Sequence, residues 1–510
     1  MPVKHCIVVG GGAAGLSCAG MLLASSVRVT LLEAGARVGG RCRTAPILSG
    51  RGACEHGATF FHGLEGNPAF ELCKSLGLLP PERAHRGAQQ RRRRRFVLRS
   101  DGKPADLDAV REVNAIMRRA IEECEDGRAA SATVGEHAHA AWVTARPSLL
   151  SAYNDDAVLL DAAWRAAESM QCAIDGCGTL WEQGTAAYAN YDEFDGKFGS
   201  SFPETGGFGA AMDALAMPLQ ESGALHTGRA AVAIQYDLDS GGVEVICEGG
   251  ESFHGDAVCI TVPIEPLKRL RFLPPLPDQK CAAMRRVVLG QVEKVYIELE
   301  PASSVDGAAT DGGGGDDGGG ADEGGGEVEA SSVELLWTAS ESSRGADVGA
   351  WTRGLHHLYH ASNEATPNQG QEEGTRSRRA TTVLVGWVTG ASARAVSGRS
   401  SAELLDEVCH DLAPFWEQIR WRPVSCSATS WSRDERFGGS WSFPTVGCPA
   451  DVSDSLSAPV LSTSGQPCVL FAGEATSRAQ FGTVGGALLS GRREASRLLH
   501  AWDWSRLTTH

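Results

Sequence analysis

A glycine-rich turn near the N-terminus constrains the fold of this chain more than any other feature. Residues 5–18 read HCIVVGGGAAGLSC, in which a short apolar, partly β-branched run is followed by glycines and by the small and aliphatic residues of a packed helix. RVTLLE at 28–33 then returns as a second strand. A strand, a tight turn, a helix and a strand in this order are the setting in which G-x-G-x-x-G predicts dinucleotide binding.

Each glycine of the motif has its own task in such a turn. Gly10 permits the tight turn, Gly12 lets the backbone approach a pyrophosphate, and Gly15 lets the helix lie close to the strand. The helix N-terminus then faces the phosphates. Glu33 ends the second strand, 18 residues past Gly15, where a carboxylate can accept both ribose hydroxyls. The alternative is a glycine-rich turn in an ordinary α/β unit.

The stretch ARVGGRCRT, which follows directly, distinguishes between the dinucleotides. NAD and FAD both fit the motif itself. Gly39 and Gly40 allow another close backbone approach, and Arg41 supplies a fixed fork of donors for phosphate oxygens. This second clamp favours the longer FAD.

Length and charge exclude several classes of protein. A chain of 510 residues is expected to hold two to four domains, at roughly 150 residues each. The formal net charge of −16 argues against a duplex nucleic-acid binder and mildly favours cationic ligands. No apolar run reaches about 18 residues, so we expect no membrane-spanning helix.

The cysteines and the chain ends bear on the compartment. The 15 cysteines show no CxxC pair and no metal-ligand spacing, which favours reduced thiols in an intracellular compartment and predicts no metal site. The chain begins almost at once with a strand rather than a signal peptide. The final TTH is not a peroxisomal tripeptide, so the cytoplasm is the expected location, with the peroxisome and the nucleus left open.

Three stretches have strongly biased composition. Residues 301–330 are rich in glycine and acidic residues and cannot bury a core, which predicts a disordered insertion in a surface loop. A smaller insertion is expected at 362–380. RRRRR at 91–95 is a nuclear address, a polyanion-binding patch or a solvated loop, and the solvated loop is favoured.

The middle of the chain carries further strand and helix patterns. Residues 201–216 predict a glycine turn that opens an amphipathic helix. AAVAIQYD at 230–237 and GVEVICEG at 242–249 predict antiparallel strands, and the prolines of RFLPPLP at 271–277 stop regular structure. LGQVEKVYIELE at 289–300 predicts another strand.

The C-terminal segment is the most informative part of the chain. CVLFAGEATSRAQFGTVGGALLSGRREASRLL, residues 468–499, predicts a buried strand, a Gly-Glu turn, a loop and a helix that begins near Val484. Such a helix start carries unpaired N–H groups and partial positive charge. This suits a flavin, whose reduced ring is anionic near N1 and O2, and the dipole contributes about 0.3–1 kcal/mol.

Eight segments together resemble the FAD-dependent amine oxidases, closest to their polyamine oxidase and spermine oxidase branch. They are VVGGGAAGL, LLEAGARVGGR, EHGATFFHG, ITVPIEPLK, FLPPLP, VEKVYIELE, GGSWSF and LFAGEATSRAQFGTVGGALLSGRREA. The resemblance brackets the whole chain and fails mainly over 81–200 and in the two insertions. It implies an α/β fold with two discontinuous domains and the active site between them. The Rossmann-type FAD-binding domain would comprise 1–80, 205–292 and 430–510, and the substrate domain, a mixed sheet with helices, 81–204 and 293–429.

The resemblance also implies a reaction. A hydride leaves the carbon beside an amine nitrogen of spermine, spermidine or an acetylated form for flavin N5, the imine hydrolyses to an aminoaldehyde, and O2 reoxidises the flavin to give H2O2. The reacting nitrogen must be neutral, which for an amine with a pKa near 10.4 costs about 4 kcal/mol at about pH 7.4. A dry, aromatic pocket lowers that cost.

Two residues match catalytic positions of the family. Lys294 matches the lysine that holds a water against flavin N5, and desolvation there could lower its pKa. The alternative is a surface lysine on an edge strand. His62 matches a histidine that animal polyamine oxidases place at the pocket mouth, where it could bind or relay a proton. The alternative is a packing histidine beside Phe60 and Phe61.

The substrate side of the site rests on fewer matches. Trp441 stands where the family has an aromatic ring beside the substrate channel, with a core aromatic as the alternative. Ser440 stands where the monoamine branch has a cysteine that bonds the flavin, so non-covalent FAD is expected. Asp175 is favoured over Glu182 as the anchor of the distal ammonium, and a surface carboxylate is an equal alternative.

The resemblance places the FAD on residues from both ends of the chain. Glu474 matches a glutamate near the ribityl and phosphate groups, and Thr483 replaces the second aromatic wall of the monoamine branch. Gly485 stands where the family commonly has His or Gln. The implied FAD contacts are Gly10, Gly12, Ala14, Gly15, Glu33, Ala34, Arg41, Gly57, Ala58, Thr59, Ala231, Glu474, Thr483 and Val484.

Three other functions compete with polyamine oxidation. A lysine-demethylase-like oxidase shares the catalytic core, but it usually adds a helical domain and a long helical hairpin that this sequence does not show. A desaturase acting on carbon–carbon bonds would be expected to lack Lys294, which is present. A flavin-binding scaffold without turnover is the non-enzyme alternative. The oligomeric state is left open.

Overall fold

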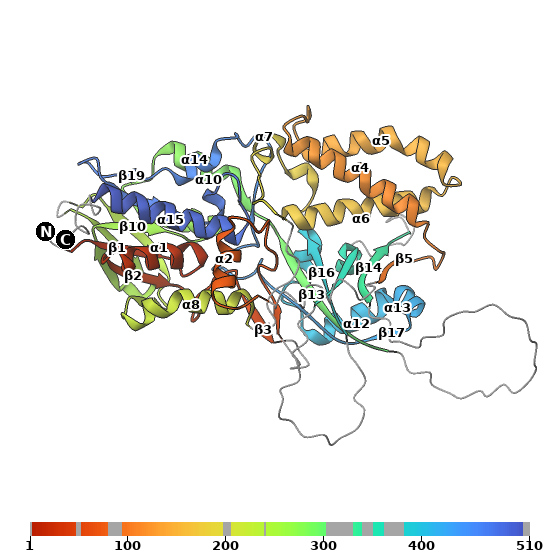
Figure 1. The fold of residues 1–510 in the computed structure, drawn as a ribbon, viewed down its shortest axis with the longest axis horizontal. Helices are drawn as coiled ribbons and strands as arrows, with labels where there is room; N and C mark the ends of the chain where they lie inside the picture. The colour runs from red at the N-terminus through yellow and green to blue at the C-terminus, as the bar shows by residue number, and fades with distance from the viewer. Residues whose placement is uncertain are drawn as a thin grey trace, which may run out of the picture.

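The computed structural model describes residues 3–46, 53–79, 94–196, 206–238, 241–301, 330–338, 350–361 and 382–502. The insertions expected at 301–330 and 362–380, apart from Pro301 and Ala330, and most of the arginine run lie outside these residues. The described chain forms two bodies that lie side by side, each built on its own sheet (Figure 1). None of its described helices combines the length and the apolar character that a bilayer crossing requires.

The first body is built on a largely parallel sheet. β1 lies between β10 and β2 and pairs in parallel with both, as a dinucleotide-binding unit requires. The predicted strands at 5–9 and 28–33 are confirmed. Within the described residues the six strands of the sheet are, in spatial order, β19 (Val460–Leu461), β20 (Pro467–Phe471), β10 (Ala257–Ile260), β1 (His5–Val9), β2 (Arg28–Glu33) and β6 (Leu225–Thr227).

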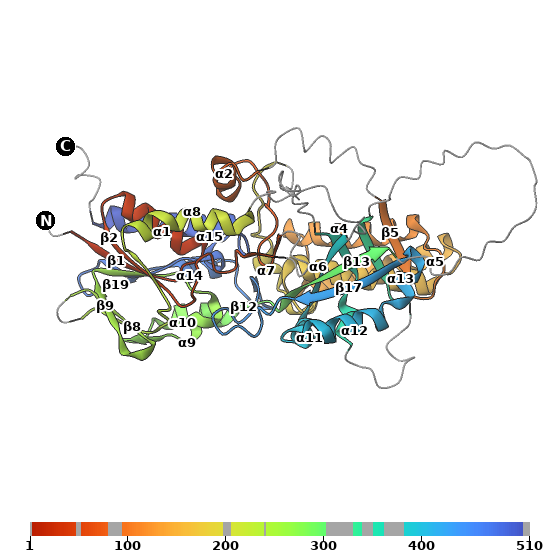
Figure 2. The ribbon, with the colours of Figure 1, turned by 90° about the horizontal axis from the view of Figure 1, so that it is seen from below.

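Three helices, two of them from the ends of the chain, cover one face of this sheet (Figure 2). They are α1 (Ala13–Ala24), α8 (Gly207–Glu221) and α15 (Val484–Ala501), which share one apolar core. The first and last of them touch: a Cβ added at Gly491 would lie 2.1 Å from the carbonyl oxygen of Ala14. The helix predicted to begin near Val484 does begin there.

A smaller sheet covers the other face. β7 (Ala231–Tyr236) and β8 (Val243–Cys247) are antiparallel, as predicted, and β9 (Ser252–Gly255) and β11 (Arg271–Leu273) flank them. β11 stops before Pro274, where the prolines end regular structure. Apolar side chains from both sheets form a second core.

Shorter elements complete this part of the chain. β3 pairs with β4, and β12 pairs with β18 at the junction with the second body. The elements are β3 (Thr44–Pro46), β4 (Ala53–Glu55), α2 (Pro68–Ser75), η2 (Glu248–Gly250), α9 (Ile264–Arg269), α10 (Asp278–Arg286), β12 (Val287–Leu289), β18 (Ser442–Pro444), α14 (Val452–Ser457) and η5 (Glu474–Thr476).

The second body is built on a mixed sheet. β13, which carries the predicted strand at 289–300, lies between β16 and β17, is antiparallel to both, and is buried from Val292 to Leu299. The alternative that this is an edge strand is therefore wrong. Among the described residues six strands pair in the order β17 (Trp421–Ala428), β13 (Val292–Pro301), β16 (Thr382–Thr389), β15 (His357–His360), β14 (Ala330–Leu336) and β5 (Arg94–Arg99).

Helices lie on both faces of the mixed sheet (Figure 1). α4 (Leu107–Glu125), α5 (Val134–Ala152) and α6 (Ala157–Asp175) cover one face, and α11 (Gly390–Val396), α12 (Ser401–Asp411) and α13 (Ala413–Ile419) the other. The remaining short helices are η1 (Leu180–Glu182), α7 (Thr185–Tyr188) and η4 (Trp351–Gly354). The architecture is α/β, as expected; the division into an FAD-binding and a substrate-binding domain stays a prediction.

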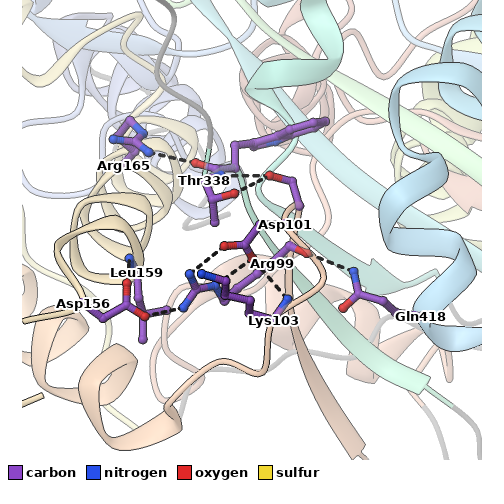
Figure 3. Close-up of polar contacts among 10 residues, drawn as sticks. Arg99, Asp101, Lys103, Asp156, Leu159, Arg165, Thr338 and Gln418 are labelled. Carbon is purple, nitrogen blue, oxygen red and sulfur yellow. Dashed lines mark hydrogen bonds and ion pairs between the residues drawn. The ribbon is translucent and has the colours of Figure 1, made fainter. Parts of the chain in front are cut away.

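A buried arginine joins three elements of the second body (Figure 3). Arg99, 2% exposed, donates to Asp156 Oδ2 at 2.6 Å and to both oxygens of Asp101 at 3.0 and 2.8 Å. Asp156 also caps α6 by accepting from the Leu159 N–H at 2.9 Å. The carbonyl of Arg99 accepts from Gln418 on α13 at 2.9 Å. The end of β5, the start of α6 and α13 are thus fixed together.

An Arg99→Met variant should lose about 2–4 kcal/mol of unfolding free energy, because two carboxylates lose a buried cation. Burial alone would raise the pKa of Asp101 and Asp156, but the hydrogen bonds from Arg99 lower it. Their contribution is therefore fully present above the unfolded-state pKa of about 3.9 and is lost progressively as the pH falls from there through the lower folded-state pKa.

Urea unfolding at about pH 7 and about pH 3 measures this loss. Arg111→Met is the matched control, because the Arg111–Asp108 pair is 67% and 70% exposed and should contribute little. An Arg99→Met loss of equal size at both pH values would contradict the ion-pair explanation.

Candidate active site

A buried lysine joins the two bodies. Lys294 on β13 is 6% exposed, and its Nζ donates to the carbonyl oxygens of Glu55 and Gly57, each at 2.6 Å, and to Thr59 Oγ1. The three acceptors lie on β4 and in the loop that follows it. An ammonium group has three protons, so a charged Lys294 has all of them engaged.

The surroundings of Lys294 disfavour its charged form. Burial lowers its pKa to about 8, against the opposing charge of Glu55. Trp387 is its cross-strand partner on β16, with the ring centroid 5.6 Å from Nζ. The rings of Phe60 and Tyr359 lie 6.1 and 5.8 Å from that of Trp387. A lysine in this aromatic setting changes protonation near neutral pH, which suits a proton acceptor.

The glycine turn forms an open cradle at the start of α1. Gly12 is the N-cap and has no side-chain capping bond, and a Cβ added there would meet nothing within 4 Å. Gly39 bridges to Gly12, and its N–H donates to the Gly11 carbonyl at 2.7 Å. At Gly15 a Cβ would lie 1.9 Å from the Gly10 oxygen, so helix and strand are in close contact as predicted. The open helix N-terminus fits a pyrophosphate.

Glu33 is held beside this turn. Its carboxylate accepts from the Gly11 N–H at 2.7 Å and the Gly35 N–H at 2.6 Å. Ala34, which lies between Glu33 and Gly35 in the sequence, is exposed. Glu33 therefore lies beside the glycine turn, and its expected contact with a ribose stays a prediction.

An ion pair joins the N-terminal and C-terminal segments. Arg41 Nη1 donates to Glu474 Oε1 at 2.8 Å and to the Ser440 carbonyl at 2.7 Å. Glu474, 5% exposed, also accepts from the Gly482 N–H at 2.8 Å and from the Ser442 hydroxyl. Arg41 is thus placed at the candidate site by Glu474, and its expected donation to a phosphate stays a prediction.

The N-terminus of α15 lies against Phe194 and Asn67, a contact that the sequence did not indicate. Thr483 is the N-cap, and its Oγ1 accepts from the Gly486 N–H at 2.9 Å. A Cβ added at Gly485 would lie 2.8 Å from the Phe194 ring and 2.9 Å from Asn67 Oδ1. The lack of a His or Gln at Gly485 thus has a packing reason, since other residues fill that space.

His62 lies among polar partners. Its Nδ1 is 3.1 Å from the Tyr191 hydroxyl and 3.4 Å from Glu193 Oε1. The neighbouring Phe61, 2% exposed, packs instead against Phe208 in the first core. His62 is half-buried, and its expected part in binding or relaying a proton stays a prediction.

Asp175, the last residue of α6, is not a surface carboxylate. Its Oδ1 accepts from Gln171 at 2.9 Å and from the Tyr188 hydroxyl at 3.2 Å, while Oδ2 is buried and accepts no hydrogen bond from a described residue. Burial raises its pKa to about 7, with the charge of Glu125 adding to the effect. Burial, with the charges of Glu193, Asp175 and Glu125 adding to it, raises the pKa of Tyr191.

Trp441 packs between two glycines. A Cβ added at Gly176 would lie 2.5 Å from its Nε1, and one added at Gly482 3.1 Å from its ring. Gly176 follows Asp175 and Gly482 precedes Thr483. The indole therefore connects the end of α6 to the start of α15.

The other expected FAD contacts lie on the same elements. Ala14 is buried on α1, the Ala58 N–H donates to the Arg41 carbonyl at 3.1 Å, Ala231 begins β7, and Val484 packs against the first core. What each residue contributes to the cofactor stays a prediction. No metal-ligating cluster occurs among the described residues.

Sequence reasoning missed several residues of this region. Tyr188, Tyr191 and Glu193 fall where the resemblance fails, and Trp387 reaches Lys294 only through the pairing of β13 with β16. Glu55 stood in the recognised segment EHGATFFHG, and a carboxylate within an otherwise apolar strand was the signal that could have revealed it.

A parallel sheet with a glycine turn, joined at a buried lysine to a second mixed sheet, defines an oxidoreductase that binds a dinucleotide. The family of flavin containing amine oxidoreductases matches residues 13–499, and the chain belongs to it. The chain is 26% identical to the peroxisomal N(1)-acetyl-spermine/spermidine oxidase of Bos taurus, over 98% of this chain and 95% of that protein. It is 26% identical to polyamine oxidase 1 of Oryza sativa subsp. japonica, over 97% and 96%. It is 25% identical to lysine-specific histone demethylase 1 homolog 3 of Arabidopsis thaliana, over 97% of this chain but 30% of that protein.

The chain is therefore an FAD-dependent amine oxidase, and the resemblance to that family is confirmed. Its FAD is held non-covalently. Ser440 offers no thiol for a covalent bond, and its hydroxyl donates to the Gly290 carbonyl at 2.9 Å. The open turn at Gly12, the carboxylate of Glu33 and the uncovered N-terminus of α1 fit such a group. When bound, FAD supplies hydride acceptance and reaction with oxygen.

Proposed function

We propose that this enzyme oxidises a carbon–nitrogen bond of spermine, spermidine or an acetylated form, with FAD accepting the hydride and O2 giving H2O2. The observation that carries the proposal is the buried Lys294, which donates to the loop at 55–59. The polyamine-oxidising relatives support it because they align over 95% and 96% of their length.

The aromatic residues and Lys294 together favour an uncharged substrate nitrogen. Removing the proton of an amine with a pKa near 10.4 costs about 4 kcal/mol at about pH 7.4. The rings of Phe60 and Trp387 would lower that cost by excluding water. A neutral Lys294 has a free lone pair and would accept the proton, directly or through a water. His62 would relay it towards solvent.

The carboxylates near the end of α6 favour a substrate with more than one ammonium group. Asp175 has a buried oxygen that accepts no hydrogen bond from a described residue, and the negative charge of Glu125 acts on it. A distal ammonium of a polyamine would occupy this region. A monoamine would leave it unused.

The lysine-demethylase alternative is weaker by coverage. The chain spans 30% of the Arabidopsis thaliana demethylase homologue and 55% of one from Oryza sativa subsp. japonica. It spans nearly all of the polyamine oxidases at the same identity. A cytoplasmic location is kept as part of the proposal, although one relative is named peroxisomal.

An assay of peroxide formation tests the proposal. The panel comprises spermine, spermidine, their acetylated forms, a monoamine and a methyl-lysine peptide. We expect at least one polyamine to give the highest kcat/KM. Turnover of the peptide alone would favour the demethylase alternative. No turnover with any amine would contradict the proposal and favour a flavin-binding scaffold without turnover.

An Asp175→Asn variant should raise KM for spermine about tenfold, or about 1.4 kcal/mol, because the distal ammonium loses its counter-charge. The KM for a monoamine should change little. Glu182→Gln is the matched control, since Glu182 Oε2 instead accepts from the Gly178 N–H at 3.1 Å. If Glu182→Gln raised KM while Asp175→Asn did not, the anchor would be wrongly assigned.

A further inference from the structure

The side chain of Glu55 takes no part in the reaction described above, yet it is tightly held. It is 7% exposed, and Oε1 accepts from the Phe208 N–H at 2.8 Å and the Thr44 hydroxyl at 3.0 Å. Gly207 allows α8 to begin here, because a Cβ there would lie 1.8 Å from Oε1. The other oxygen, Oε2, is buried and has no hydrogen-bond partner among the described residues.

The backbone of Glu55 faces the lysine. Its carbonyl oxygen accepts from Lys294 Nζ at 2.6 Å and from the Tyr296 hydroxyl at 2.7 Å. The following turn is also fixed, since Trp431 Nε1 donates to the His56 carbonyl at 2.9 Å. Glu55 therefore holds the start of α8 through its side chain. Its carbonyl oxygen accepts hydrogen bonds from two side chains of β13.

The charges around Lys294 are few. Burial raises the pKa of the Cys54 thiol to about 11 and also raises that of the Tyr296 phenol. Burial lowers the pKa of the His56 imidazole to about 4. These three groups are neutral near pH 7. Burial raises the pKa of the Glu55 carboxyl too, but the hydrogen bonds from Phe208 and Thr44 and the charge of Lys294 favour its charged form. The groups whose charge acts on the lysine are Glu55 and Cys54 from β4, and Trp387 from β16 places its ring beside Nζ. Tyr296 from β13 shares the Glu55 carbonyl with the lysine, and burial followed by the charges of Arg43, Lys294 and Arg37 lowers the pKa of His56.

We propose that Glu55 is a positioning residue for Lys294: its side chain fixes the turn that receives the ammonium, and its negative charge opposes the effect of burial and so raises the pH at which Lys294 becomes a proton acceptor. A charged Lys294 has three protons engaged by the turn, and only the neutral form has a free lone pair. An opposite charge at close range typically shifts such a titration by about 1–3 units. The catalytic consequence rests on the proposed function, but the coupling of the two residues does not.

A double-mutant cycle on the full-length protein tests the coupling without substrate. Glu55→Gln keeps an oxygen for the Phe208 N–H and the Thr44 hydroxyl but removes the charge. We compare its urea unfolding with that of Lys294→Met and of the double variant. The two losses should be non-additive at about pH 7 and additive at about pH 10, where Lys294 is neutral. Additive losses at both pH values, or equal coupling at both, would overturn the proposal.

The pH profile of flavin reduction by saturating spermine tests the consequence. The rise of the reduction rate with pH that we assign to deprotonation of Lys294, called the limb below, should lie about 1–2 pH units lower in Glu55→Gln. It should be absent in Lys294→Met. It should keep its position in Glu55→Asp, which keeps the charge. Glu494→Gln is the control: Glu494 is fully buried and pairs with Arg493 and Arg497 on α15, so its loss should lower stability without moving the limb. An unshifted limb in Glu55→Gln overturns the inference. If no polyamine reduces the flavin, the proposed function fails, and the unfolding cycle still decides the role of Glu55.

Discussion

A Lys294→Met variant will bind FAD and turn over about 10²–10⁴-fold more slowly than the native enzyme, which is the usual contribution of a positioned acid–base group. Methionine fills the same buried space but can neither donate to the 55–59 loop nor accept a proton. Rapid-mixing measurement of flavin reduction by spermine, and of flavin reoxidation by oxygen, shows which half-reaction is slowed.

Lys280→Met provides the matched control for that variant. Lys280 is 4% exposed, burial lowers its pKa to about 8, and its Nζ donates to the carbonyls of Ser455 and Leu456 at 3.0 and 2.8 Å. It is thus a second buried lysine on backbone carbonyls, but it lies away from the junction of the two bodies. Its replacement should lower stability and leave both rates unchanged. Equal rates in native protein and Lys294→Met would remove Lys294 from the mechanism.

The two glycines of the N-terminal motif should respond in opposite ways to an added methyl group. Gly12 has φ of −79° and open space where a Cβ would lie, so Gly12→Ala should fold normally. The methyl would occupy the space expected for the pyrophosphate, and FAD should bind at least about tenfold more weakly. At Gly15 the methyl would lie 1.9 Å from the Gly10 oxygen and 2.8 Å from Thr261 Oγ1. Gly15→Ala should therefore lose about 3 kcal/mol or more of stability.

The flavin-to-protein absorbance ratio and the melting temperature of the flavin-free protein separate these effects. Gly12→Ala should lower the first and leave the second unchanged, whereas Gly15→Ala should lower the second. A Gly12→Ala protein with full FAD content would show that no phosphate group lies against the start of α1.

The parts of the fold that depend on local pattern were predictable from sequence. β1, α1 and β2 follow from an apolar run, a glycine turn and a packed helix, and α15 begins at Val484 as the pattern indicates. β13 was also predicted, but its central position was not, because pairing with β16 and β17 depends on residues far away in sequence. The edge-strand alternative for Lys294 was wrong for that reason.

The site itself was only partly predictable. The expected residues Arg41 and Glu474 are 433 positions apart, and their ion pair follows from the contact of α1 with α15 rather than from either segment. Asp175 was expected with a surface carboxylate as the alternative, and burial at the end of α6 excludes that alternative. Phe194, which fills the space beside Gly485, lies where no family motif was recognisable.

The central claim is that the first and last segments of the chain hold one FAD beside Lys294, open to an uncharged amine. Anaerobic addition of spermine to the purified protein tests this most directly. The account predicts about one FAD per chain, loss of the yellow absorbance on addition of spermine, and its return with H2O2 when oxygen is admitted. A colourless protein that FAD does not reconstitute, or a bound flavin that stays oxidised with every amine, would contradict it.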